Sequence, residues 1–270
     1  PQKSRPPEDI ATEIINLVSA GAREITLLGQ NVLAYGRDLD DKPDFADLMR
    51  RLAPIEGLWR LRFTTAHPRD VDDKLIDTIA SLPAACEHFH LPLQAGHDRV
   101  LKAMNRGYST AYYLDLVDKI RTRIPGVSLT TDLMVGFPGE SDEEFEASME
   151  LYRRIGFDQA FTFAYSTRPG TPAADFQNQV PQKIKVVRLN RLIELTTASA
   201  LSRNQAAIGD TGEVLVEGPS PKDPALLAGR LRNNKYVVFP GDSDLTGNLT
   251  TVKLTEAHMW GFGGGRQPSG

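Results

Sequence analysis

The stretch SLTTDLMVGFPGESDEE, Ser128–Glu144, decides the fold of this chain. Its apolar part, residues 129–135, predicts a buried strand, which runs into a turn with a glycine on either side of Pro138. Ser141 and Glu144 have capping-box spacing, so a helix is expected directly after the turn. Such a turn above a helix N-terminus is a typical ligand site of α/β proteins, although a single one is also an ordinary βα connection.

Upstream and downstream of this stretch, short apolar runs alternate with segments of helical periodicity. We expect strands at residues 25–28, 61–64, 89–93, 129–135 and 160–164, and helices at residues 6–19, 45–52, 73–80, 98–105, 110–123 and 141–155. The apolar runs are continuous rather than alternating, which is typical of parallel strands. The pattern predicts an α/β fold, either a βα barrel or a doubly wound sheet.

Each expected strand is followed by small or polar residues. These strand ends are Gly29–Asn31, Thr65–His67, Gln94–Gly96, Gly136–Glu140 and Ser166–Gly170. In parallel α/β proteins the carboxyl ends of the strands share one edge, and that edge carries the site. The five ends together therefore predict a single pocket.

The pattern changes after Asp175, which places the α/β unit at residues 1–178. Residues 179–206 predict a linker helix with five basic residues and one acidic residue. Expected strands at 213–217, 227–232, 235–239 and 248–256 indicate a small β-barrel over residues 207–261. The glycine-rich tail, residues 262–270, is expected to be disordered.

The composition limits the class of protein. A net charge of −4 favours no particular partner, and a single cysteine, Cys86, excludes a disulfide framework and fits a reducing compartment. The sequence has no apolar run of the ~20 residues that a membrane-spanning helix needs.

Histidines and basic residues offer two kinds of site. His88 and His90 have metal-ligand spacing, and with His67 and Asp132 they could hold a metal ion; the alternative is that they are barrel-lining or hydrogen-bonded histidines. Lys102, Arg106 and Tyr108 form a basic and aromatic cluster that could bind RNA or form a solvated helix end. In the barrel, Lys222, Arg230, Arg232 and Lys235 form a basic group, although residues 207–261 hold more acidic than basic side chains.

Five segments together resemble one enzyme family. LLGQNV (27–32), HLPLQAG (90–96), LKAMNRGY (101–108), TDLMVGFPGE (131–140) and YSTRPGTPA (165–173) closely resemble the radical S-adenosylmethionine methylthiotransferases. Residues 214–234 and 254–257 are similar to the C-terminal TRAM domain of that family, a small RNA-binding β-barrel. Residues 29–32 and 168–171 resemble the branch that acts on N6-isopentenyladenosine in tRNA, whereas Leu33 and residues 95–97 depart from its pattern.

The resemblance implies a partial parallel βα barrel of the radical SAM type, followed by a TRAM barrel. It implies an enzyme that adds a methylthio group to C2 of N6-isopentenyladenosine at position 37 of tRNA, using S-adenosylmethionine and, in the intact protein, two [4Fe–4S] clusters. From their places at the strand ends, the expected S-adenosylmethionine contacts are Gly29, Gln30, Asn31, Gln94, Gly136, Phe137, Tyr165 and Ser166. The expected contacts to RNA are Arg106, Arg168, Lys222, Arg230, Arg232 and Lys235.

The cluster cysteines of the family would precede residues 2–5, and Cys86 is the chain's single cysteine. We therefore expect a fragment without cluster ligands, inactive by itself, derived from a monomeric cytoplasmic enzyme. Two other classes remain open at this point. One is a metal-dependent hydrolase with zinc at His88 and His90, and the other is a non-catalytic tRNA-binding module.

Overall fold

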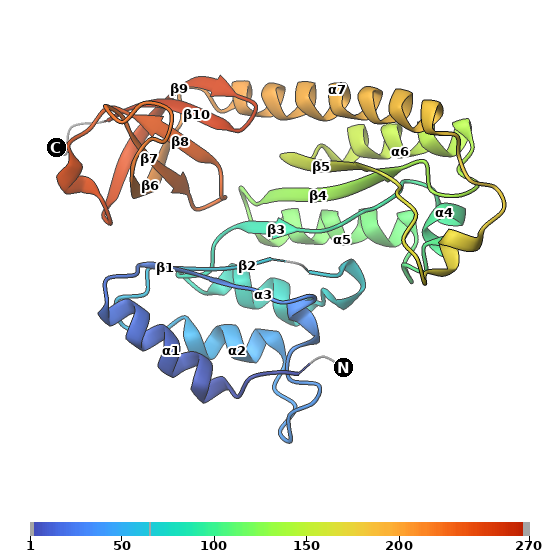
Figure 1. The fold of residues 1–270 in the computed structure, drawn as a ribbon. Coiled ribbons are helices and arrows are strands. Elements are labelled where there is room, and N and C mark those ends of the chain that lie inside the picture. The colour runs from blue at the N-terminus through green and yellow to red at the C-terminus, as the bar shows by residue number, and fades with distance from the viewer. Residues whose placement is uncertain (1–2, 65, 267–270) are drawn as a thin grey trace.

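The computed structural model describes residues 3–64 and 66–266, which form an α/β unit followed by a small β-barrel (Figure 1). The strands of the α/β unit are β1 (Glu24–Leu27), β2 (Arg60–Phe63), β3 (His88–His90), β4 (Ser128–Val135) and β5 (Gln159–Ala164). Its helices are α1 (Pro7–Ser19), α2 (Phe45–Leu52), α3 (Asp73–Ser81), α4 (Asp98–Ala103), α5 (Thr110–Arg123), α6 (Asp142–Ile155) and α7 (Gln182–Ala206). Thr65, which was expected at a strand end, lies outside the described residues.

The helices begin where the sequence places their capping residues. Pro7 is the first residue of α1, where its missing N–H is not needed. Asp44 with Asp47 forms a capping box at α2, and Ser141 with Glu144 forms the predicted one at α6. These local signals explain why the expected helix starts agree closely with the structure.

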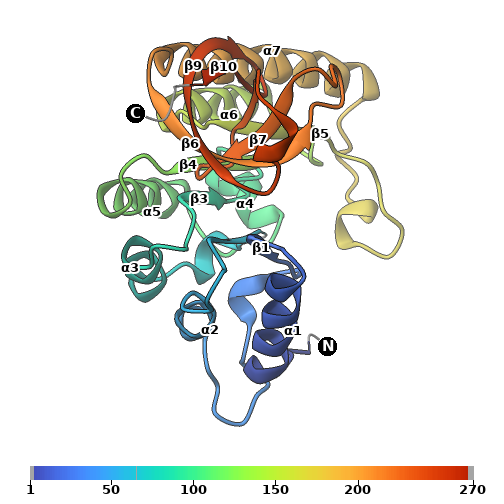
Figure 2. The same cartoon turned by 90° about the vertical axis from the view of Figure 1, so that its left-hand side faces the viewer.

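The strands of the α/β unit form one curved row. β1 pairs with β2, and β3 pairs with β4 and β4 with β5, all in parallel. The two sheets are joined through Leu61, whose N–H donates to Ala84 O at 2.7 Å and whose carbonyl accepts from Cys86 N at 3.1 Å. Helices α1, α2, α3, α5 and α6 lie outside this row (Figures 1 and 2). The predicted partial barrel is confirmed, and the doubly wound alternative is wrong; we call residues 3–206 the half-barrel.

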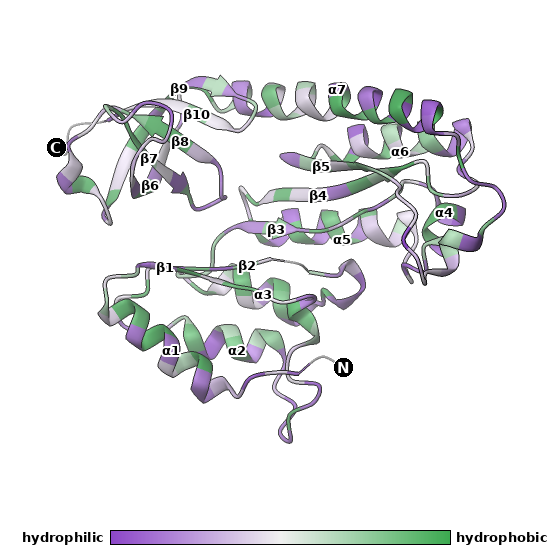
Figure 3. Cartoon of the chain, in the orientation of Figure 1, coloured by the Kyte–Doolittle hydropathy of each residue, from purple (hydrophilic) through white to green (hydrophobic). Residues whose placement is uncertain are grey.

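The main core fills the space between the strands and the outer helices. Leu61, Phe63, Phe89 and Leu129 are almost fully buried there, and the helices turn apolar faces toward them (Figure 3). The opposite, concave face carries polar side chains and the half-exposed Phe161. This face is available to contact other parts of the molecule or a ligand.

Helix α7 is part of the half-barrel and not a linker, which corrects the expected boundary at residue 178. It runs beside β5 and α6 (Figure 1). Every third or fourth residue forms a buried stripe, made of Lys185, Arg188, Leu192, Thr196, Ala200 and Asn204. Two of its basic residues are therefore buried inside the protein, so the charge of the helix does not mark a free RNA-binding face.

The C-terminal barrel comprises β6 (Thr211–Pro219), β7 (Leu227–Leu231), β8 (Tyr236–Phe239), β9 (Leu249–His258) and β10 (Gly261–Arg266). The strands close in the order β10-β8-β7-β6-β9. The expected disordered tail is wrong for residues 262–266, because β10 pairs with β8 and β9 and buries Phe262. Glycine is needed there, since a Cβ on Gly264 would overlap Val252. The rest of that tail, residues 267–270, lies outside the described residues.

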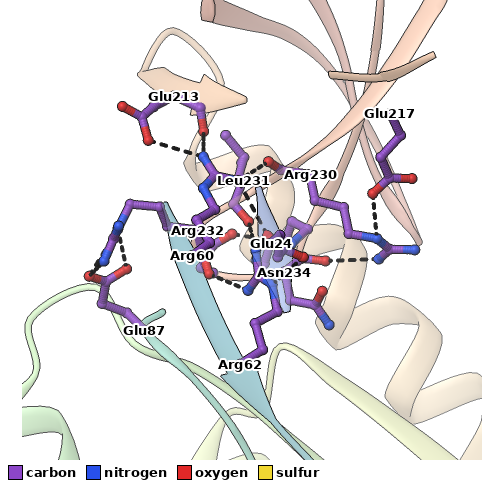
Figure 4. A network of polar contacts seen from close by, with 12 residues as sticks. Glu24, Arg60, Arg62, Glu87, Glu213, Glu217, Arg230, Leu231, Arg232 and Asn234 are labelled. Carbon is purple, nitrogen blue, oxygen red and sulfur yellow. Dashed lines mark hydrogen bonds and ion pairs between the residues drawn. The ribbon is translucent and has the colours of Figure 1, made fainter. Parts of the chain in front are cut away.

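Arg60 joins the barrel to the half-barrel (Figure 4). Its side chain projects from the concave face of β2 and is 1% exposed. The guanidinium donates to Arg230 O at 2.6 Å and to Glu213 O at 2.9 Å, both in the C-terminal barrel. Because buried cations require partners, these carbonyls fix the position of the barrel.

Arg62 makes the same kind of contact two residues further along β2. Its guanidinium donates to Arg232 O at 2.6 Å and Leu231 O at 2.8 Å, and its Nε lies 2.8 Å from Glu24 Oε1. We call Arg60 and Arg62 the docking arginines. They hold the barrel to the half-barrel (Figure 4). The barrel lies at the amino-terminal ends of the strands, away from the predicted ligand edge (Figure 1).

None of the helices in the described part of the chain combines the length and apolarity that a membrane crossing requires.

Candidate functional site

The turn after β4 is held in shape by α7. Gly136 has φ +73°, and its N–H donates to Glu140 Oε2 at 2.6 Å. Arg188 of α7 donates to the same carboxylate at 2.7 Å, and a Cβ on Gly136 would lie 2.5 Å from Cγ of Lys185. Burial raises the pKa of Glu140, while the Gly136 N–H and Arg188 act in the opposite direction. The turn therefore has a backbone that only glycine fits easily and a carboxylate partner of its own.

Phe137 and Tyr165 are buried in an aromatic cluster beside this turn. Their ring centroids are 5.3 Å apart, and Phe137 also contacts Phe176 at 6.2 Å. Lys185 donates from Nζ to Tyr165 O at 3.0 Å and lies over the Tyr165 ring. The side chain of Phe137 thus supports the turn, whereas the backbone of the turn and the exposed Ser166 remain at the strand edge.

Gln94 is fixed by its backbone. It has φ +68°, its N–H donates to Asp132 O at 2.8 Å, and its carbonyl accepts from Met134 N at 2.9 Å. These bonds attach the segment that follows β3 to β4. The side chain of Gln94 is half-buried at the same edge as Gly136.

Asn31 is already engaged by the protein. Its Nδ2 donates to Asp70 Oδ2 at 2.6 Å, and its Oδ1 accepts from Leu33 N at 3.3 Å and His67 N at 3.4 Å. This side chain therefore ties the end of β1 to the loop after β2. Gly29 and Gln30 are exposed beside it.

The strand ends share one edge of the half-barrel, because all its strand pairs are parallel. Residues 29–31 line a cavity of about 1000 Å³ along β1, whose walls come from residues 3–48. Gln94, Gly136, Phe137, Tyr165 and Ser166 are not among its walls. The structure thus brings the predicted S-adenosylmethionine contacts to one edge, but not into that one cavity.

The two strand histidines share a threonine and do not form a metal site. His88 Nε2 and His90 Nδ1 lie 3.2 and 3.0 Å from Thr130 Oγ1, and His90 Nε2 lies 3.5 Å from Asp132. Burial, helped by the charge of Arg62, lowers the pKa of His88 to about 3, so it is neutral near pH 7. Residues 3–64 and 66–266 contain no group of three His, Cys, Asp or Glu that could hold a metal ion. The barrel-lining alternative is confirmed.

Two predicted RNA contacts form ion pairs between the C-terminal barrel and the half-barrel. Arg232 forms a bidentate pair with Glu87, with its Nη2 2.8 Å from Glu87 Oε1, and Lys235 Nζ lies 2.8 Å from Asp158 Oδ1. Both acidic partners belong to the half-barrel. An internal ion pair thus partly satisfies each of these two charges, and their contact with RNA stays a prediction.

The other predicted RNA contacts are more accessible. Arg230 pairs with Glu217 at 3.0 Å and is 40% exposed, and Lys222 is exposed in the barrel. Arg168 is exposed after β5. Arg106 is half-buried beside Tyr108, and its Nε has no hydrogen-bond partner in the described part of the chain. These four residues do not form one surface, because Arg106 and Arg168 follow the carboxyl ends of β3 and β5, whereas the C-terminal barrel lies at the amino-terminal ends of the strands (Figure 1).

The sequence analysis missed the docking arginines and an exposed tryptophan, Trp260. The sequence did carry a signal for the docking arginines. Charged and apolar residues alternate in Arg60-Leu61-Arg62-Phe63, and this alternation indicates a strand with one polar face. Trp260 had no periodic pattern around it.

Comparisons with known proteins agree with this architecture. The Radical SAM superfamily matches residues 1–152 and the TRAM domain matches residues 205–261. A tRNA-2-methylthio-N(6)-dimethylallyladenosine synthase of Carboxydothermus hydrogenoformans is 53% identical over 96% of the chain and 59% of the relative. The synthase of that name from Moorella thermoacetica is 52% identical over 96% of the chain and 58% of the relative.

Solved structures show the same fold at low identity. Coproporphyrinogen III oxidase from Escherichia coli, a radical SAM enzyme, has a TM-score of 0.56 at 13% identity, over 83% of this chain and 59% of that one. A radical S-adenosylmethionine methyltransferase from Kitasatospora setae has a TM-score of 0.51 at 18% identity, over 63% of this chain and 31% of that one. The parallel half-barrel and the match over 152 of 270 residues lead to one conclusion: the chain belongs to the Radical SAM superfamily, with a TRAM domain at its C-terminal end.

Proposed function

We propose that the chain is the S-adenosylmethionine-binding and RNA-binding part of a tRNA methylthiotransferase. The modified position would be C2 of N6-dimethylallyladenosine at position 37, next to the anticodon. The observation that carries this proposal is the 53% identity to a synthase of that name along 96% of the chain, through both domains in the same order. The chain spans about three fifths of that relative's length, so the activity belongs to the whole protein.

The edge formed by the strand ends is the proposed S-adenosylmethionine site. Residues 29–31 would receive the methionine amino or carboxylate group, and Gln94 the ribose or carboxylate. The adenine would meet the backbone of Gly136 and Phe137, with Tyr165 and Ser166 at its edge. The Tyr165 hydroxyl supports this placement, since it is buried without a hydrogen-bond partner in the described residues. When bound, S-adenosylmethionine supplies a methyl group and, after reductive cleavage, an adenosyl radical.

The residues of this chain do not fit the ligand set of an iron–sulfur cluster. Such clusters need several thiolates, and the chain has one cysteine. Burial raises the pKa of the Cys86 thiol to about 11, so it is protonated near pH 7. The two [4Fe–4S] clusters proposed for the intact enzyme would take their cysteines from elsewhere in it. We further propose a monomeric enzyme in the cytoplasm.

The test is a nucleoside analysis in the organism that carries the gene. Deleting the full gene should remove 2-methylthio-N6-dimethylallyladenosine from digested tRNA and leave its precursor, N6-dimethylallyladenosine, in place. Mass spectrometry distinguishes the two nucleosides, and the restored gene should return the methylthio form. Unchanged nucleosides after deletion would refute the proposal.

A further inference from the structure

A cleft between the two domains is separate from the strand-end edge. It has a volume of about 1070 Å³ and is lined by both the half-barrel and the C-terminal barrel. Its half-barrel wall includes His88, Ser128 and Gln159, which begin β3, β4 and β5. Gly136 and Tyr165 lie beyond the opposite ends of these strands. We call this space the interdomain cleft.

Aromatic side chains face the interdomain cleft from both domains. Phe161 of β5 is 46% exposed, and Trp260, between β9 and β10, is 62% exposed. Tyr236 of β8 is a further aromatic residue of the barrel wall. Exposed aromatic rings are costly to leave in water and typically mark a binding surface. A flat, uncharged ligand would cover them.

The charges that line the interdomain cleft balance. Its basic residues are Lys222, Arg230 and Lys235, and its acidic residues are Asp158, Glu217 and Asp223. Arg230 pairs with Glu217 and Lys235 with Asp158, while His88 is neutral. A balanced lining gives little attraction to a chain of phosphates, which needs an excess of positive charge. It suits uncharged bases, whose edges amide side chains can recognise.

Gln159, Asn233 and Asn234 supply such amides in the cleft lining. We infer that the interdomain cleft binds unpaired nucleobases of RNA, with Trp260 and Phe161 as stacking surfaces. This inference rests on the proposed function, which makes RNA the partner of the C-terminal barrel. Stacking on aromatic rings is the common way in which proteins hold single-stranded nucleic acid.

The bases held in the cleft are not the base that reacts. From Phe161, the proposed stacking residue in the half-barrel wall, to Ala164 at the end of β5 the strand covers three residue steps, about 10 Å at about 3.3 Å per residue. The proposed cofactor edge lies beyond that end. The cleft therefore holds neighbours of the modified adenosine, and the RNA must extend along the concave face of the half-barrel.

The docking arginines keep the two walls of the cleft at a fixed separation. Arg60 and Arg62 bind carbonyls of β6, β7 and the residue after β7, so the barrel cannot turn without breaking buried hydrogen bonds. A preformed cleft loses less entropy when RNA binds. Both walls must contribute to affinity if the inference is right.

Trp260 provides a direct optical probe. The chain has two tryptophans, and a Trp59→Phe variant leaves Trp260 as the reporter. Titrating it with a single-stranded heptaribonucleotide should quench or shift the emission, whereas the same sequence in a duplex should not. In that background, Phe161→Ala should weaken the affinity for the RNA on the order of tenfold, as measured by filter binding. Trp260→Ala should weaken it by a similar factor, and filter binding is again the measurement because this variant has lost the fluorescent reporter.

Trp260→Phe should retain most of the affinity, because phenylalanine can still stack. Tyr112→Ala is the matched control, since Tyr112 is a 40% exposed aromatic residue on α5, outside the cleft lining. An unaltered tryptophan emission, or losses for both cleft variants equal to that of Tyr112→Ala, would overturn the inference. A loss with Trp260→Ala alone would also overturn it, because the barrel would then bind RNA without the half-barrel wall. Nucleoside analysis tests the proposed function separately, since it reports methylthio transfer and not the binding surface.

Discussion

His88 shows how burial of a single side chain makes stability depend on pH. It lies in the wall between the two domains, and its pKa falls from 6.5 to about 3 because burial disfavours the imidazolium, with Arg62 adding repulsion. The folded protein keeps it neutral, while the unfolded chain binds a proton below pH 6.5. Its contribution to stability is therefore complete above pH 6.5 and is lost as the pH falls toward 3.

We expect the free energy of unfolding to fall by about 2 kcal/mol between pH 7 and pH 5 because of His88. His88→Gln should remove this part of the pH dependence, as glutamine stays neutral and can still bond to Thr130. Urea unfolding at pH 7 and at pH 5 measures this change in the free energy of unfolding for each protein. His258→Gln is the control, because the His258 side chain is 60% exposed. Equal slopes for the wild type and His88→Gln would contradict the assignment.

At the scale of the element, the turn between β4 and α6 depends on α7. Gly136→Ala should destabilise the protein through its φ of +73° and through contact with Lys185. Gly170→Ala is the matched control, because Gly170 has φ +79° and no atom within 4 Å of an added Cβ. The control should cost about 1 kcal/mol, the usual cost of a left-handed residue with a side chain. Thermal unfolding should show a clearly larger loss of stability for Gly136→Ala than for Gly170→Ala. Equal losses would mean that the Lys185 side chain moves away from the added Cβ without an energetic cost.

Strand β10 closes the C-terminal barrel, and Phe262 supplies its side chain in the core. Phe262→Ala should cost about 3–5 kcal/mol in unfolding free energy, as large aromatic truncations in a core do. Hydrogen exchange at the amides of β8 and β9 should rise, because β10 pairs with both. Leu249→Ala, at a 36% exposed position of β9, should cost far less. Unchanged exchange in β8 would show that the barrel does not need β10.

The difference between β10 and α6 shows what the sequence could predict. Ser141 and Glu144 act on their own helix, so local spacing was enough to place its start. β10 has a glycine-rich sequence with no strand pattern, and its need for glycine arises from Val252, a residue on another strand. The partners of Asn31 and Arg232 could not be predicted either. The chemistry of these side chains indicated ligand contacts, but each one bonds to a residue distant in the chain, Asp70 and Glu87 respectively. Periodicity predicted the α/β unit and the small β-barrel, and the family resemblance was needed to choose a partial βα barrel over a doubly wound sheet. Side-chain partners between elements could not be predicted from the sequence.

At the scale of the whole molecule, the docking arginines make two domains into one body. Arg60→Met with Arg62→Met should remove an arginine donor from each of four barrel carbonyls and leave Glu24 without its partner. Breaking one buried ion pair costs about 3–5 kcal/mol, which is enough to release the barrel. We expect a larger radius of gyration in small-angle X-ray scattering, with circular dichroism unchanged.

Arg50→Met with Arg153→Met serves as the control, because both side chains are close to half-exposed and, among the described residues, form ion pairs only with neighbours on their own helices. This control should scatter like the wild type. If the docking variant also does so, the barrel is held by other contacts, such as those of Lys235 and Arg232.

The docking arginines mainly grip main-chain oxygens of the C-terminal barrel, and every amino acid supplies such an oxygen. Side chains on the barrel's outer surface can therefore diverge during evolution while the interface with the half-barrel is kept. Substitutions of those side chains alone could therefore change which RNA sequences the protein binds, without changing the interface between the two domains.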